Sequence, residues 1–250
     1  MSWDETLAIR NDWKSLSAHP VQDPMAYEAD GTEHTLRQYA EAMIAVSGNT
    51  GADHLLMHLG RERVEATLAE MGHVHPEMNR PLLATRELFA LDVAVPTESV
   101  ETYVQAEEAE RRALLDATVR PVDVAPVQAI DWVVPRNLES VGWFASATDL
   151  GQAMVELWTM AEEPGLTPIQ DILVLSPGID PSLIDAESWS YIGHKGGALP
   201  GGLNRTWLLE RSDGRRFVFV VTLNNPRAPL DLVTPDAVLA GAFVLLAARE

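Results

Sequence analysis

The residues best suited to chemistry lie in a glycine-rich stretch late in the sequence. Lys195 is followed at once by Gly196 and Gly197, and Tyr191 and Ile192 begin an extended run just before it. A lysine at the end of a strand, beside glycines that let a ligand approach the backbone, is an arrangement that can do chemistry. A surface lysine in an ordinary glycine-rich turn is the alternative that this stretch alone leaves open.

A second polar group, the tripeptide Ser47-Gly48-Asn49, falls in a tight break between two apolar helical segments. Packed helices on both sides would fix the directions of its side chains. The alternative is a plain helix–helix turn in which Asn49 or Thr50 caps the next helix, and the tripeptide alone favours that alternative. Its pairing with the downstream lysine and glycines shifts the interpretation toward a functional site.

Helical segments surround this break. Thr35 can cap a helix whose apolar residues recur at 3.6-residue spacing and which ends at the break. A second helix is predicted from residue 50 to 59, and Gly60 separates it from a third over 61–71. Residues 1–34 are predicted to be irregular. Further helices are predicted at 85–92, 98–117, 124–131, 146–163 and 168–174.

The last quarter of the chain predicts strands and a closing helix. Residues 204–211 and 215–223 are hydrophobic runs joined through Asp213-Gly214, and Asp-Gly between such runs is a strong hairpin signal. Residues 234–249 are nearly all apolar, so they predict a helix packed against the sheet. Helices followed by antiparallel strands and a final helix predict an α+β fold.

Composition limits the domain organisation and the partners. The 250 residues suit one large domain over 1–250, with a mainly helical part at 35–187 and the sheet and last helix at 188–250. The 37 acidic and 18 basic residues give a net charge of −19, which argues against nucleic acid and anionic membranes as partners. No apolar run reaches the roughly 18 residues of a membrane span. The first ten residues lack the apolar core of a secretory signal, so we expect a cytoplasmic protein unless the true N-terminus lies upstream.

The order and spacing of the two motifs resemble those of the penicillin-recognising serine hydrolases, the class A β-lactamase-like family. Residues 43–56, Met-Ile-Ala-Val-Ser-Gly-Asn-Thr-Gly-Ala-Asp-His-Leu-Leu, are similar to the family's Ser-Asp-Asn segment. Residues 191–223 are similar to its Lys-Thr-Gly strand and the following hairpin. The insert between these regions is more similar to a divergent branch related to the cephalosporin-esterase-like protein of clavulanate gene clusters.

This resemblance implies a helical subdomain beside an antiparallel sheet with a C-terminal helix, and acyl-enzyme chemistry on β-lactam or ester substrates. Ser47 matches the family's proton-relay serine. Lys195 matches the lysine whose charge attracts the substrate carboxylate and supports the relay serine. Arg205 lies about where some members of the family place a carboxylate-binding arginine. The alternative is that Arg205 is a solvated arginine of the hairpin. The substrate-binding positions that carry over are Asn49, Gly197, Ala198 and Arg205.

The sequence departs from the family at several positions. Gly48 stands in place of an aspartate, and Gly196 in place of a threonine or serine, so one hydroxyl donor to the substrate carboxylate is absent. The loop at 74–79 is similar to the family's Glu-Pro-Glu-Leu-Asn loop, but His75 occupies the position of the catalytic glutamate. Glu77 is the nearby residue that could act as acid or base. Without a placed carboxylate an acyl-enzyme would turn over slowly.

The family's Ser-x-x-Lys motif, which carries the nucleophile and its base, is absent, because no serine has a lysine three positions later. We therefore expect that the N-terminal part of the fold is missing and that the nucleophile is not in this chain. Whether the chain is an enzyme stays open: it is either a serine hydrolase completed by an upstream segment or a non-catalytic remnant or binding module. The strand at 215–223 is apolar on both faces, so an uncovered sheet is expected to self-associate.

Histidines offer a metal-binding alternative. His54 and His58 lie four residues apart on one predicted helix, and His73 and His75 follow in the next loop, so the imidazoles could converge on zinc. No acidic residue stands between His54 and His58, as an HExxH motif requires. The sequence therefore predicts no metal and no cofactor.

Overall fold

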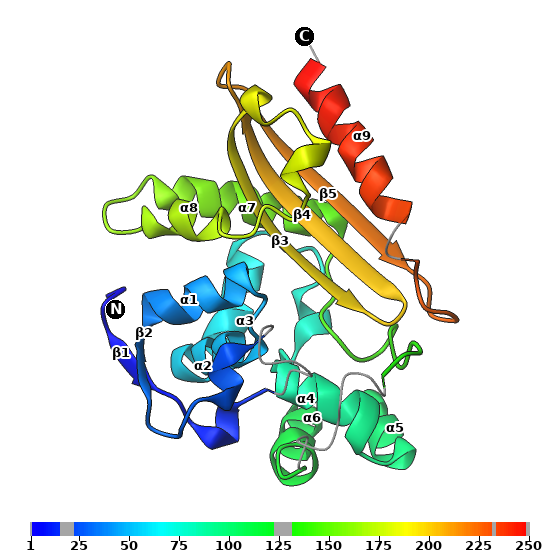
Figure 1. Cartoon of the computed structure of the whole chain (residues 1–250). Helices are drawn as coiled ribbons and strands as arrows, with labels where there is room; N and C mark the ends of the chain where they lie inside the picture. The colour runs from blue at the N-terminus through cyan, green and yellow to red at the C-terminus, as the bar shows by residue number, and fades with distance from the viewer. Residues whose placement is uncertain (1, 16–22, 123–131, 232–233, 249–250) are drawn as a thin grey trace. The chain divides into compact units, whose positions relative to one another are not determined.

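The computed structural model describes residues 2–15, 23–122, 132–231 and 234–248 (Figure 1). The chain falls into two compact units, Met1–Ala145 and Ser146–Glu250. Helices dominate the first unit, and an antiparallel sheet with helices forms the second. The predicted α+β class is confirmed, whereas a single domain over the whole chain stays a prediction. Within the described ranges, no helix has the length and apolar character needed to cross a bilayer.

The first unit contains a small sheet that the sequence does not predict. Strand β1 (Thr6–Ala8) pairs antiparallel with β2 (Glu33–Thr35). The prediction that residues 1–34 are irregular is therefore wrong at these strands, which are too short and too far apart in sequence to give a local periodicity. The helices of this unit are α1 (Leu36–Ala45), α2 (Asn49–Leu59), α3 (Arg61–Glu70), α4 (Thr85–Phe89), α5 (Thr97–Gln105) and α6 (Glu108–Leu114).

Local sequence signals explain the first two helices. Thr35 caps α1 by accepting a hydrogen bond from the Gln38 amide (3.2 Å), and the Gln38 side chain accepts one from the Thr35 amide (2.8 Å). Helix α2 packs closely on α1 at Gly51, where a Cβ atom would lie 3.0 Å from the carbonyl oxygen of Tyr39. This close approach holds the two ends of the Ser47 break together.

The helix predicted over 98–117 is interrupted. Ala106 is extended and separates α5 from α6, and the Arg111 side chain donates to the carbonyls of Val104 (2.8 Å) and Ala106 (2.9 Å). Arg111 thus satisfies carbonyl groups that a continuous helix would have bonded itself. Helix α6 continues into a π-helical turn, η5 (Leu115–Val119), and α4 into another, η4 (Ala90–Ala94). The helix predicted at 124–131 lies outside the described residues.

The second unit is built on a sheet with the strand order β3-β4-β5. Its antiparallel strands are β3 (Trp189–Leu199), β4 (Gly202–Arg211) and β5 (Arg216–Asn224), so the predicted hairpin is confirmed. The placement of Lys195 at the end of a strand is wrong, because β3 continues through both following glycines. Lys195 lies opposite Thr206, inside the strand rather than beside a turn.

Helices pack on both faces of this sheet (Figure 1). On one face, Trp207 and Phe219 stack on each other at 5.3 Å and contact Phe243 of α9 (Thr234–Ala248). On the other face, α7 (Ala147–Ala161) approaches β5, since a Cβ at Gly151 would lie 3.7 Å from Val218. Both faces of β5 therefore have a covering helix, so the prediction of an uncovered sheet is wrong for the faces of this strand. The strand lies at the edge of the sheet, and its outer side pairs with no strand in the described part of the chain.

Candidate active site

The Ser47 break is a tight turn with an exposed serine. Ser47 has a φ of 55°, which places this non-glycine residue in the left-handed region. The Gly48 amide closes the turn by donating to the carbonyl of Ala42 (3.0 Å), and α2 begins at the next residue, the half-buried Asn49. Backbone strain at an exposed polar residue is typical of functional turns.

A carboxylate from a distant segment supports this turn. Asp23 is buried, and its Oδ2 accepts a hydrogen bond from the Thr50 amide (2.8 Å) at the start of α2. A Cβ atom at Gly48 would lie 3.1 Å from the Ala42 carbonyl oxygen and 3.4 Å from Asp23 Oδ1. Position 48 therefore has little room for the aspartate that the family carries, and Asp23 brings a carboxylate to the same place. Burial raises the pKa of Asp23, and the hydrogen bond from Thr50 opposes that rise.

Asp23 is a residue that sequence reasoning missed. It is separated from Thr50 by 27 positions, and a carboxylate that caps a helix from so far away leaves no local pattern. The same helix start holds a second distant residue, because the Thr50 hydroxyl donates to the Ser15 carbonyl (2.9 Å).

The zinc alternative is not supported by the histidines of this unit. His54 is fully buried, with Nδ1 bonded to the Thr50 carbonyl (2.7 Å) and Nε2 accepting from the Arg10 amide (2.9 Å). His73 bonds instead to the carbonyl of Phe144 (2.7 Å). No group of three histidine, aspartate or glutamate side chains within the described ranges is placed to hold a metal ion.

Glu77 lies on a 3₁₀ turn, η3 (Pro76–Asn79), with 65% of its side chain exposed. Its own backbone amide and the nearby His75 lower the pKa of its carboxyl. A lower pKa makes a carboxylate a weaker base, so these surroundings do not prepare Glu77 to activate water. Its role as acid or base stays a prediction.

In the second unit, Lys195 is half-buried within β3. Side chains alternate along a strand, so Lys195 and Thr206 lie on the face away from α9, whereas His194 and Trp207 lie on the α9 face. Burial lowers the pKa of Lys195. Its Nζ donates to the carbonyl of Gly196. The ammonium group is thus partly withdrawn from water. In this less polar environment it attracts an anion more strongly than an exposed lysine does.

The two glycines after Lys195 have different environments. A Cβ at Gly196 would lie 2.9 Å from the Asn204 carbonyl oxygen and 3.0 Å from Nε2 of His194, whereas a Cβ at Gly197 would meet nothing within 4 Å. The His194 ring also fills the space beside Gly178, where a Cβ would lie 2.3 Å from it. Position 196 therefore has no room for the threonine or serine of the family pattern unless the His194 ring or a neighbouring backbone moves.

His194 itself is held as a neutral ring. Its Nδ1 bonds to the carbonyl of Ser176 (3.2 Å), and its ring lies 5.1 Å from that of Trp207. Burial, with the charge of Lys195 next in importance, lowers the pKa of His194 to about 4. The histidine therefore acts as a packing spacer beside the lysine at neutral pH.

The remaining predicted binding residues also belong to the second unit. Arg205 forms an ion pair with Asp236 of α9 (2.5 Å) and donates to the Gly178 carbonyl (3.4 Å), so it is anchored rather than freely solvated. Ala198 is exposed near the end of β3. Ser47 and Asn49 belong to the first unit, so a shared cleft stays a prediction.

Comparisons with known proteins identify the family. The sequence profile of the β-lactamase enzyme family matches residues 1–240, and the chain belongs to this family. No curated protein sequence matches the chain.

Solved structures show the same fold. The β-lactamase from Sphaerobacter thermophilus DSM 20745 is similar with a TM-score of 0.58 and 16% identity, over 99% of this chain and 73% of that chain. PBP-A is similar with a TM-score of 0.58 and 16% sequence identity, over 98% of this chain and 71% of that chain. The TLA-3 extended-spectrum β-lactamase is similar with a TM-score of 0.61 and 12% sequence identity, over 98% of this chain and 76% of that chain. The serine β-lactamase/transpeptidase fold predicted from the motifs is therefore confirmed.

The contrast between the two glycines predicts opposite responses to the same substitution. Gly196→Ala should lower the free energy of unfolding by about 1–3 kcal/mol, because the added methyl has to displace the Asn204 carbonyl or the His194 ring. Gly197→Ala is the matched control and should change the free energy of unfolding by less than about 0.5 kcal/mol. Urea unfolding followed by tryptophan fluorescence measures both. Equal losses in the two variants would contradict the packing argument.

Proposed function

We propose that this chain is the substrate-recognition part of a serine hydrolase that acts on β-lactam or ester substrates through an acyl-enzyme, with the nucleophile outside the chain. The observation that carries the proposal is the partly desolvated Lys195 inside β3, with open space above Gly197 two residues further along the strand. An ammonium group in this setting suits the carboxylate that a penicillin presents. Membership of the β-lactamase enzyme family supplies the substrate class.

The other residues then take complementary roles. Ser47 would relay a proton to the leaving nitrogen or oxygen, with its hydroxyl supported by the Lys195 charge. Asn49 would bond the amide side chain of the substrate. Arg205 stays a predicted carboxylate-binding residue, although its ion pair with Asp236 of α9 places it on the opposite face of the sheet from Lys195. The backbone of Gly197 and Ala198 would line the scissile carbonyl, with the Ala198 N–H in the oxyanion hole.

Deacylation is the weak step in this proposal. The exposed Glu77 has a lowered pKa and is poorly suited to activate water. An acyl-enzyme formed with such surroundings would be long-lived. This favours esterase-like or binding behaviour over rapid β-lactam hydrolysis.

The alternative is a non-catalytic binding module of the same fold. The observation in its favour is that no serine of this sequence is followed by lysine at the third position. An in-frame Ser-x-x-Lys segment in the gene upstream of Met1 would support the hydrolase, and stop codons there would support the binding module.

Binding of a penicillin tests the recognition role directly. We expect penicillin G to bind the chain without a covalent bond, and Lys195→Ala to weaken this binding at least tenfold because the buried charge is lost. Lys14→Ala is a matched control, since Lys14 is the second of the two lysines and its Nζ bonds to a backbone carbonyl. Titration calorimetry measures the affinities. Equal weakening in both variants, or no binding at all, would contradict the proposal. A stoichiometric adduct by intact mass would reveal a nucleophile within the chain.

The shared cleft is tested by crosslinking, which the absence of cysteine makes simple. If Ser47 and Lys195 face one cleft, a Ser47→Cys/Lys195→Cys variant should react within the molecule with a short bifunctional maleimide. The control pair joins Ser47→Cys to Ser212→Cys, at the residue that follows the end of β4, six residues or about 20 Å from Thr206. Faster crosslinking of the control pair, or none in either variant, would refute the shared cleft.

We further propose that the chain self-associates by pairing its β5 edge with the same edge of a second copy. The edge is unpaired in the described part of the chain, and Leu223 is 36% exposed on it. Light scattering should show dimers that increase with salt, because salt screens the repulsion between chains of charge −19. Leu223→Lys should reduce the dimer, whereas Leu175→Lys, at an exposed site outside the sheet, should leave it unchanged. A wild-type monomer at all concentrations would refute the pairing.

A further inference from the structure

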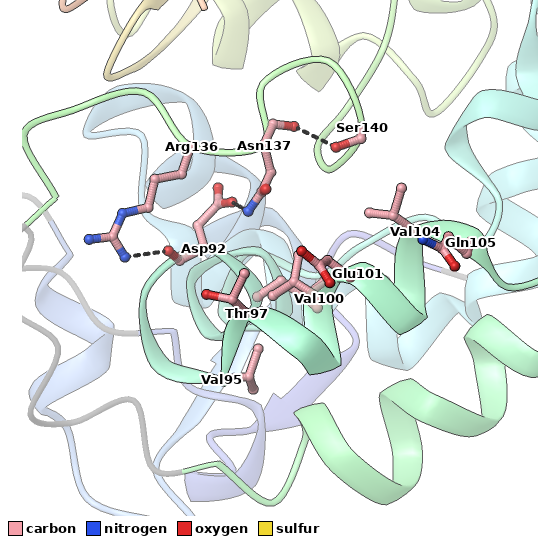
Figure 2. Close-up of a pocket in the computed structure, with 11 residues that line it drawn as sticks. Asp92, Val95, Thr97, Val100, Glu101, Val104, Gln105, Arg136, Asn137 and Ser140 are labelled. Carbon is pink, nitrogen blue, oxygen red and sulfur yellow. Dashed lines mark hydrogen bonds between the residues drawn. The ribbon is translucent and has the colours of Figure 1, made fainter. Parts of the chain in front are cut away.

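A cavity in the first unit lies apart from every residue assigned above. Its volume is about 540 Å³, within the range of small-molecule sites, and it lies between η4, α5 and the segment 136–140 (Figure 2). Apolar side chains, among them Val95, Val100 and Val104, form part of its wall. Polar groups, including Asp92 and Glu101, also line it.

Asp92 is the unusual member of this lining. It is 4% exposed, and its Oδ1 accepts a hydrogen bond from the Asn137 side chain (2.9 Å), as Figure 2 shows. The Arg136 guanidinium donates to the backbone carbonyl of Asp92 (2.9 Å) instead of to its carboxylate. Among the described residues, no donor reaches the second carboxylate oxygen, Oδ2.

Two other buried acids of the same unit, Glu87 and Asp53, have donors at both carboxylate oxygens. Glu87 receives two hydrogen bonds from Arg61 (2.7 and 2.9 Å), and Asp53 accepts two backbone N–H groups (2.7 and 2.9 Å). Asp92 has one neutral amide from Asn137. A buried carboxylate with one neutral donor costs stability, so its presence in a cavity wall points to a ligand that supplies the missing donor.

The backbone at this place is also irregular. Asp92 lies in the π-helical turn η4, and such turns occur frequently at functional sites. Asn137, its hydrogen-bond donor, has a φ of 49° in the left-handed region. Two unusual backbone conformations therefore meet at the one hydrogen bond that the carboxylate receives.

We propose that this cavity binds a primary alkylammonium group, with the ammonium on Asp92 Oδ2 and the alkyl chain on the valines of the wall. The ammonium supplies the N–H donor that Oδ2 lacks and offsets the negative charge of Asp92. Glu101 at the exposed rim adds a second negative charge, while Arg136 contributes the one nearby positive charge among the lining residues. An anionic ligand would face both carboxylates, so the charge balance favours a cation.

The ionisation of Asp92 gives the site a characteristic pH dependence. Burial raises the pKa of Asp92 to about 7, against the opposing effects of the Asn137 hydrogen bond and the Arg136 charge. Below pH 7 the carboxyl is mostly protonated and has lost the charge that attracts an ammonium. Affinity should therefore rise as the pH increases through 7. Glu101, Arg136 and Asn137 are the charged or hydrogen-bonding groups that face this carboxyl.

The test compares n-butylammonium with n-butanol by titration calorimetry on the whole chain. We expect butylammonium to bind at least tenfold more tightly than butanol at pH 8, and at least tenfold more tightly at pH 8 than at pH 5. Asp92→Asn should lower its affinity at least tenfold, and Glu101→Gln about two- to threefold. Glu98→Gln removes the same charge from α5 outside the cavity and should have no effect.

Several outcomes would overturn the proposal. Equal binding of butanol would show a hydroxyl site rather than a cation site. An affinity that is the same at pH 5 and pH 8, or undetectable binding of butylammonium, would exclude Asp92 as its partner. The pH comparison uses the unchanged chain, so it decides the question even where a variant fails to fold.

Discussion

Close packing at two glycines determines how both motifs of the candidate site are built. A side chain at Gly48 would press against a carbonyl oxygen of α1, and one at Gly196 would press against a carbonyl oxygen of β4. In each case a polar side chain lies in the adjoining space: Asp23 of a distant segment beside Gly48, and His194 of the same strand beside Gly196. A side chain at position 48 would crowd the Ala42 carbonyl, and one at position 196 would require the His194 ring or the Asn204 backbone to move.

Local signals account for what the sequence predicted correctly. The capping box at Thr35 and the Asp-Gly turn between β4 and β5 are encoded within a few residues, so helix α1 and the hairpin follow from them. The sheet of β1 and β2 and the carboxylate of Asp23 depend on contacts between distant segments. Periodicity carries no information about such contacts, which explains why both were missed.

The position of Lys195 within β3 shows a second limit of local sequence signals. Consecutive glycines usually mark a turn, so the sequence predicts Lys195 at the end of a strand. Here both glycines remain in the β3 ladder, since Gly196 has the His194 ring and a neighbouring strand against it. Glycine inside a strand can mark a close approach of backbone, and that cause applies at position 196. The hairpin prediction is therefore confirmed, whereas the predicted position of Lys195 within its strand is wrong.

The electrostatics of the two units suggest a division between recognition and turnover. In the second unit, Lys195 is partly desolvated within β3, whereas Arg205 of β4 is paired with Asp236 on the other face of the sheet. Such preorganised charge stabilises a bound anion in both the ground state and the transition state, and equal stabilisation of both does not accelerate a reaction. Acceleration needs a nucleophile and a base whose pKa is near the working pH, and the exposed Glu77 has the opposite shift. The proposed function therefore assigns substrate binding, the proton relay and the oxyanion hole to this chain, and the nucleophile to a group outside it.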